Sequence, residues 1–218
     1  MRKIQFLIIA VLFGYSFSAM AQTLITFSTS SVDGILTQSQ VNAQRNSAVG
    51  GVTTDYTAEF DNSVTGIGTA AFSTNPGRLI SVTFNNNITS IEERAFVLCA
   101  GLTSITIPAS ITNIGDRAFS SCRRSAIITF EGITPPTLGT DAFSDAGIGI
   151  SGTEIPTINL PNATNKLDWY APLLAAGISD AMLRANGIEP PPSNKKTILR
   201  IGGKMKVGKG TKIIMGPP

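Results

Sequence analysis

The two cysteines of this 218-residue chain are the side chains whose type and spacing point most directly to covalent chemistry. Cys99 and Cys122 lie 23 residues apart, which is the period of the repeat described below. Equivalent Cα atoms in stacked strands are ~4.8 Å apart, within the ~4.4–6.8 Å that a disulfide requires. Two interpretations follow: a disulfide between successive repeats, or two free thiols that act as small apolar core residues.

The sequence offers no catalytic constellation. It contains no histidine, so the usual metal ligand and the usual activator of a serine nucleophile are both missing. Glu92 and Glu93 adjoin Arg94 in an expected turn, where adjacent carboxylates are solvated rather than paired for proton transfer. Asp141 and Asp145 do not match the spacing of a calcium loop. We therefore expect no catalysis, no metal site and no cofactor.

An Ala-Phe dipeptide recurs four times and identifies the elements that must position these groups. Its phenylalanines are spaced 24, 23 and 24 residues apart. A fixed period of this size is typical of a solenoid, whose units stack because no unit buries its apolar face alone. We expect the four rings to form one interior column, consisting of Phe72, Phe96, Phe119 and Phe143.

Each Ala-Phe pair is followed by a segment in which apolar and small polar side chains alternate. The ranges are 79–84, 102–107, 125–130 and 155–160, and the alternation predicts short strands with one buried face. Turns or short helices are expected on the opposite side of each repeat. The outward positions carry hydroxyls, which form either a contact surface or an ordinary strand face. The candidate contact residues, including basic residues at the rim, are Thr83, Thr106, Thr129, Arg78, Arg123 and Arg124.

The segments Ala100–Pro108 and Ile114–Phe119 resemble the BspA-type leucine-rich repeat. The resemblance covers about residues 67–161 and implies a leucine-rich-repeat solenoid, rich in short strands. It also implies a secreted or cell-surface bacterial protein, since members of that family are secreted or lie on the bacterial cell surface. The family is associated with adhesion and with binding of host or matrix proteins. Ser125 replaces the leading leucine of its repeat and residues 144–154 form an insertion, so we expect an irregular last coil.

The beginning of the chain has the features of a secretory signal peptide. Residues 1–21 combine Arg2 and Lys3, an apolar run and a small-residue site ending at Ala21. The apolar run is shorter than the ~20 residues of a membrane-spanning helix, and no later segment is apolar enough to span a bilayer. We expect cleavage near Ala21 and a secreted, periplasmic or cell-surface location.

The segments that flank the repeats differ from them in composition. Residues 22–66 contain no clear repeat and are assigned as an N-terminal cap, because the first coil of a solenoid needs a cover. Residues 162–188 are expected to form a C-terminal helical cap, whose first helix begins near Asp168 with Pro172 in its first turn. Residues 189–218 are a proline-rich linker and a basic tail.

Charge divides between the body and the tail. Residues 22–188 carry 8 basic and 13 acidic side chains, whereas residues 189–218 carry 7 basic and 1 acidic. The body therefore shows no basic stripe of the kind that nucleic acid requires. The tail at 195–212 is either a loosely ordered segment or hairpin, or a contact for an anionic surface. We expect a non-catalytic, adhesion-type interaction protein with a protein or glycan partner; the alternative is a structural envelope spacer without a specific ligand.

Overall fold

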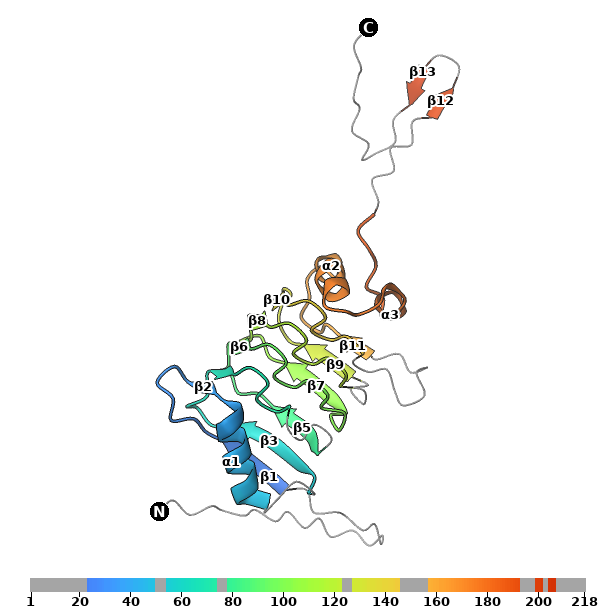
Figure 1. The fold of residues 1–218 in the computed structure, drawn as a ribbon. Coiled ribbons are helices and arrows are strands. Elements are labelled where there is room, and N and C mark those ends of the chain that lie inside the picture. The colour runs from blue at the N-terminus through green and yellow to red at the C-terminus, as the bar shows by residue number, and fades with distance from the viewer. Residues whose placement is uncertain are drawn as a thin grey trace, which may run out of the picture.

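The computed structural model describes residues 23–49, 54–73, 78–122, 127–145, 157–192, 199–201 and 204–206. The predicted signal peptide lies outside these residues, and so do Arg123 and Arg124. Within the described part, the chain passes repeatedly through the same two walls of parallel strands, as Figure 1 shows. A coil is defined here as one long strand, the short strand that follows it, and the chain leading to the next long strand.

One wall is built from the long strands. They form two three-stranded parallel sheets, and the last strand of the first sheet adjoins the first strand of the second (Figure 1). Within one strand, Ile105 and Ile107 are buried while Ser104 and Thr106 are exposed, which is the alternation that the sequence predicts. The strands are β1 (Thr23–Phe27), β3 (Tyr56–Phe60), β5 (Leu79–Thr83), β7 (Ser104–Ile107), β9 (Ile127–Phe130) and β11 (Thr157–Asn159).

The opposite wall is a five-stranded parallel sheet of two-residue strands. Each strand turns one side chain into the core, and Leu36, Ile67, Ile91 and Ile114 are fully buried there. Three residues earlier in the chain, Val64, Ile88 and Ile111 form a second buried column. The strands are β2 (Ile35–Leu36), β4 (Gly66–Ile67), β6 (Ser90–Ile91), β8 (Asn113–Ile114) and β10 (Thr137–Leu138).

The Ala-Phe turns form a third line of hydrogen bonds between coils. The backbone N–H of Phe96 donates to the carbonyl of Ala118 at 2.8 Å, and that of Phe119 donates to Ala142 at 2.7 Å. The residue before each Ala-Phe pair has a left-handed backbone, for example Arg94 at φ 56°. A non-glycine residue in this conformation costs ~1–2 kcal/mol, which the bonds between coils offset.

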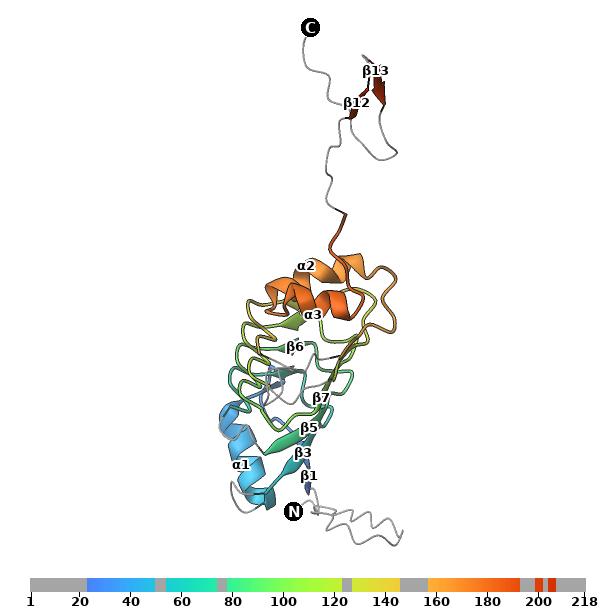
Figure 2. The ribbon, with the colours of Figure 1, turned by 90° about the vertical axis from the view of Figure 1, so that its right-hand side faces the viewer.

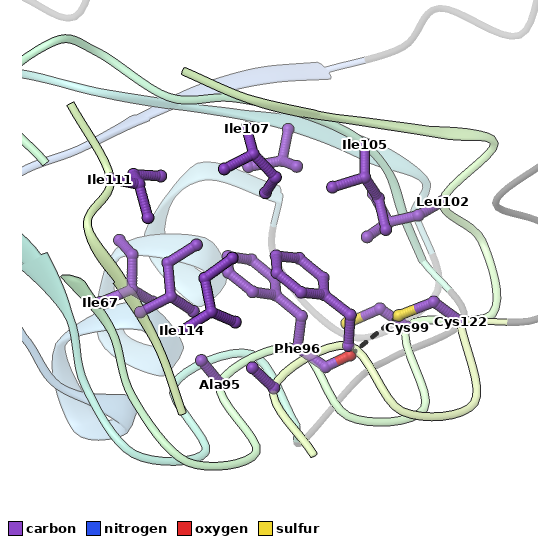
Figure 3. Close-up of a cluster of buried hydrophobic side chains, with 14 of the residues drawn as sticks. Ile67, Ala95, Phe96, Cys99, Leu102, Ile105, Ile107, Ile111, Ile114 and Cys122 are labelled. Atoms are coloured by element: carbon purple, nitrogen blue, oxygen red, sulfur yellow. Dashed lines mark hydrogen bonds between the residues drawn. The ribbon is translucent and has the colours of Figure 1, made fainter. Parts of the chain in front are cut away.

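The four phenylalanines of these turns are fully buried and stack in sequence. Their ring centroids are 4.8 Å apart for Phe72 and Phe96, 5.1 Å for Phe96 and Phe119, and 5.2 Å for Phe119 and Phe143. Figure 3 shows Phe96 in the interior, with Ile105 and Ile107 of the long-strand wall above it and Ile67 and Ile114 of the opposite wall beside it. Burying each ring contributes ~1.5–3 kcal/mol, so this column is a main part of the core.

The strand ladders begin before residue 67, where the sequence analysis placed the first repeat. β1 pairs with β3 in parallel and β2 pairs with β4, so strand pairing already includes the segment assigned as an N-terminal cap. The first coil lacks an Ala-Phe turn, and helix α1 (Gln38–Val49) takes its place. Gln38 Nε2 donates to the carbonyl of Ala70 at 3.1 Å, which continues the turn ladder through a side chain.

Two short helices follow the last long strand. They are α2 (Leu167–Ala175) and α3 (Asp180–Ala185), and they lie at the opposite end of the stack from α1 (Figure 2). The carbonyls of Ala175 and Ala176 accept the N–H groups of Asp141 and Phe143, so the end of α2 occupies the position of a further turn.

The first of these helices starts within one residue of the expected position, but the expected place of its proline is wrong. α2 begins at Leu167, so Pro172 lies in its second turn rather than its first. Proline here removes one helical hydrogen bond, to the carbonyl of Asp168. Asp168 is exposed, so water can satisfy that carbonyl. Beyond the helices, β12 (Leu199–Ile201) and β13 (Lys204–Lys206) form an antiparallel pair within the basic tail.

Candidate functional site

The outward face of the long-strand wall carries the predicted hydroxyl rows. In the β7–β9–β11 sheet, Thr106 is in register with Thr129 and Asn159. In the β1–β3–β5 sheet, Thr26 is in register with Glu59 and Thr83. Parallel pairing repeats equivalent positions every ~4.8 Å, so polar groups recur along the stack. We call this outward surface of the six long strands the strand face.

The strand face is nearly neutral in the described part of the chain, where Glu59 is its one charged side chain. Thr83 and Thr106 are exposed. Thr129 is half-buried, and its hydroxyl accepts a hydrogen bond from Asn159 Nδ2 at 3.3 Å. A neutral face with free hydroxyls can form hydrogen bonds to a polar partner but supplies no long-range attraction.

Arg78 lies at the rim of this face and already has an acidic partner. Its Nη1 lies 3.0 Å from Asp55 Oδ1, and both side chains are more than a third exposed. An exposed pair of this kind is worth ~0–1 kcal/mol. Arg78 can therefore be released by a partner at little cost.

The two cysteines are free and fully buried, so the disulfide alternative is not what the structure contains. Each thiol faces a carbonyl of the preceding coil. Cys122 Sγ lies 3.2 Å from the Phe96 oxygen (Figure 3), and Cys99 Sγ lies 3.8 Å from the Phe72 oxygen. Burial raises the pKa of Cys122 to about 12 and raises the pKa of Cys99 well above its ordinary value. Neither thiol is therefore poised as a nucleophile.

Of the adjacent glutamates Glu92 and Glu93, only Glu92 links two turns. Glu92 Oε2 accepts hydrogen bonds from the backbone N–H and the hydroxyl of Thr69, both at 2.8 Å, across one coil. Glu93 Oε1 lies 3.1 Å from Arg94 Nη1. Among the described residues, no three acidic or cysteine side chains gather in a way that could hold a metal ion.

A cavity between the two walls escaped the sequence analysis. It has a volume of about 290 Å³ and lies beside Trp169 of α2, where the chain crosses from β9 to β10. The available signal was Pro135, which occupies the position that Val64, Ile88 and Ile111 hold in the preceding coils. Trp169 is fully buried, so its ring is not an open stacking platform for sugars.

In the described segments, no helix is both long and apolar enough to cross a bilayer. Parallel ladders of short strands, joined by turns that recur at a fixed period, define the class of leucine-rich-repeat proteins. The model of the BspA type leucine-rich repeat region matches residues 52–171 with six copies. The chain belongs to that family.

Two solved structures are similar to parts of this chain. One is a leucine-rich cell surface protein from Faecalibacterium prausnitzii, with 39% identity over 38% of this chain and a TM-score of 0.34. The other is a leucine-rich repeat protein from Eubacterium ventriosum, with 18% identity over 48% of this chain and a TM-score of 0.38. The matches span 21% and 32% of those two chains. None of the curated proteins compared matches this chain.

Proposed function

We propose that this protein is an exported, non-catalytic, adhesion-type interaction protein whose strand face contacts a protein or glycan outside the cell. One observation carries the proposal: outward polar positions recur in register within each sheet of the described strand face, backed by a buried core, and Thr83 and Thr106 are exposed. The stack then acts as a solenoid that holds the face rigid. The cell-surface description of the similar Faecalibacterium protein agrees with export and with a location outside the cell.

In this proposal, the helices close the two ends of the solenoid. α1 packs beside β1, and α2 accepts hydrogen bonds from the last Ala-Phe turn. Closing both ends prevents the open strand edges from pairing with other chains. The face spans five strand spacings of ~4.8 Å, or ~24 Å. A face of that length favours a weak or multivalent contact over a large single interface.

The test adds charge to the strand face and measures attachment of protein-coated beads to matrix-coated and mucin-coated surfaces. Thr83→Lys combined with Thr106→Lys should reduce attachment at least tenfold to whichever surface binds. Thr140→Lys is the matched control, because Thr140 is also exposed but lies in a turn away from the long strands. Equal attachment of all three proteins would overturn the proposal, and no attachment of any protein would favour the spacer role.

The rim arginines are the proposed polar anchors of this contact: Arg78, Arg123 and Arg124. Because Arg78 pairs with Asp55, Asp55→Asn should release its guanidinium and strengthen attachment severalfold. Arg78→Ala should weaken attachment. If both changes leave attachment unaltered, Arg78 has no part in the contact.

The basic tail at 195–212 is proposed as a contact for anionic surfaces. Its seven basic residues contrast with the acidic body, and each basic residue near an anionic membrane contributes ~1 kcal/mol. Sedimentation with vesicles containing phosphatidylglycerol should retain the mature chain but not a chain that ends at Pro192. Retention of both chains would contradict this role.

A further inference from the structure

The side chain of Asn186 joins the last long strand to the last helix of the C-terminal cap. Its Oδ1 accepts the backbone N–H of Ile158, in β11, at 2.8 Å. Its Nδ2 donates to the carbonyl of Met182, in α3, at 2.9 Å. Because β11 is the end strand of its sheet, the amide oxygen supplies the acceptor that a further strand would supply. We call these two hydrogen bonds the Asn186 bridge.

Asn186 and Gly187 form the single Asn-Gly pair of the sequence. In such a pair, the backbone nitrogen of the glycine can attack the side-chain Cγ of the asparagine. The Cγ–Nδ2 bond breaks, ammonia leaves with the proton of the attacking nitrogen, and a five-membered succinimide remains. Water then opens this ring to aspartate or isoaspartate. Gly187 is exposed and, apart from its chain neighbours, no atom lies within 4 Å of the position of an added Cβ, so the ring is not crowded.

The folded chain restrains both reacting groups. The N–H of Gly187 donates to the carbonyl of Arg184 at 3.0 Å, and a nitrogen that keeps its proton is a poor nucleophile. The amide of Asn186 is held at both of its polar atoms by the bridge. These contacts belong to the end of α3, a helix of six residues, and helix ends open locally at far lower free energy than a whole domain. The reaction therefore requires opening of α3 but not unfolding of the stack.

We propose that Asn186 is a self-modification site, at which deamidation breaks the Asn186 bridge and releases α3 from β11. Either product replaces the Nδ2 donor by a carboxylate oxygen, so the carbonyl of Met182 loses its hydrogen bond. Isoaspartate also inserts an extra carbon into the backbone before Gly187, which moves the carboxylate away from Ile158. The new negative charge lies at the C-terminal end of α3, where the helix dipole opposes it.

The first test compares the native mature chain with the same chain unfolded in urea, both incubated at neutral pH. Peptide mapping by mass spectrometry detects the replacement of the amide NH2 by a hydroxyl. In the unfolded chain, Asn186 should react before every other asparagine, because glycine follows it alone. In the native chain it should react at least tenfold more slowly, since the end of α3 must open first. Equal rates in the two samples, or a native chain unmodified at Asn186 after months, would overturn the proposal.

A variant at the other end of α3 tests whether the helix controls the reaction. Ser179 is the N-cap, and its Oγ accepts the N–H of Met182 at 3.3 Å. Ser179→Ala removes this cap and should speed the modification of Asn186 severalfold in the native chain. Ser104→Ala, which changes an exposed serine of β7, is the matched control and should leave the rate unaltered. The same rate in both variants would contradict control by α3.

Hydrogen exchange tests the release of α3 from β11. The modified chain carries an added negative charge, so ion exchange separates it from the parent. In the isoaspartate form, the amide of Ile158 should exchange at least tenfold faster than in the parent. The amide of Ile105, in β7 within the same sheet, should keep its rate. Asn186→Ala should raise the exchange of Ile158 without any modification. Unchanged exchange of Ile158 in the isoaspartate form would refute the release.

Discussion

The rings of Phe96 and Phe119 stack in parallel, with centroids 5.1 Å apart and planes inclined by only 2°. The two residues are 23 positions apart in the chain, which is one repeat. Their stacking therefore aligns equivalent positions of two successive coils. The backbones above the rings are tied together, because Phe96 N–H donates to the carbonyl of Ala118. Ring stacking and hydrogen bonding therefore hold the same register.

Removing one ring from this column should destabilise the whole stack. Phe119→Ala leaves a cavity in a fully buried site, and the free energy of unfolding should fall by ~3–5 kcal/mol. Leu174→Ala removes an exposed side chain as a control and should change it by less than ~0.5 kcal/mol. Urea denaturation measures both. A loss below ~1 kcal/mol for Phe119→Ala would mean that the column is not a main part of the core.

The left-handed turn positions predict an unusual gain from glycine. Leu98 has φ 62° and is 54% exposed, so its side chain adds strain but little burial. Leu98→Gly should be more stable than Leu98→Ala by ~1 kcal/mol, because glycine adopts positive φ without steric cost. Thermal denaturation of the two variants provides the comparison. A more stable alanine variant would show that this turn is not left-handed in solution.

The backbones of two coils approach so closely at Gly115 that any larger residue there should destabilise the fold. A Cβ at Gly115 would lie 2.6 Å from the backbone nitrogen of Glu93 in the neighbouring coil. Gly115→Ala must separate two coils and should cost ~1–3 kcal/mol. Gly132→Ala, whose nearest contact would be the Thr134 carbonyl at 3.1 Å, should cost less than ~1 kcal/mol. Equal costs for the two variants in urea denaturation would argue against coils packed this closely.

The buried thiols predict loss of stability in alkaline solution. The folded-state pKa of Cys122 is raised from 9.0 to about 12 by burial, so the unfolded chain releases its proton first. Stability is therefore unaffected below about pH 9 and falls between pH 9 and 12. Cys122→Ala should flatten that decline in a series of urea titrations. An identical decline in the variant would assign the alkaline loss to other groups.

The repeated core was readable from the sequence because each coil uses the same residue types at the same spacing. Ala95-Phe96 and Ala118-Phe119 fix the period, and alternation around Ile105 and Ile107 fixes which side of the strand is buried. The hydroxyl rows then follow from geometry alone, since parallel pairing places Thr106 beside Thr129.

The first coil and the long strand of the second were not predicted as repeats, because their residues do not carry that signature. Tyr56 and Ala58 stand where later coils have leucine and valine, and α1 is mostly polar, with Val41 and Arg45 as its buried side chains. A helix that buries so little has a weak apolar period. The cavity was missed for a different reason: it depends on Pro135 and Trp169, which are far apart in the sequence and meet only when α2 folds over the last coil.

Hydroxyl-radical footprinting of the attached protein tests the strand face most directly. Ile127, on the strand face, and Leu174, on α2, are aliphatic side chains with nearly equal exposure, 44% and 42%. On the surface to which the protein attaches, oxidation of Ile127 should fall severalfold while that of Leu174 stays at its free value. Protection of Leu174 with Ile127 still fully oxidised would contradict contact through the strand face.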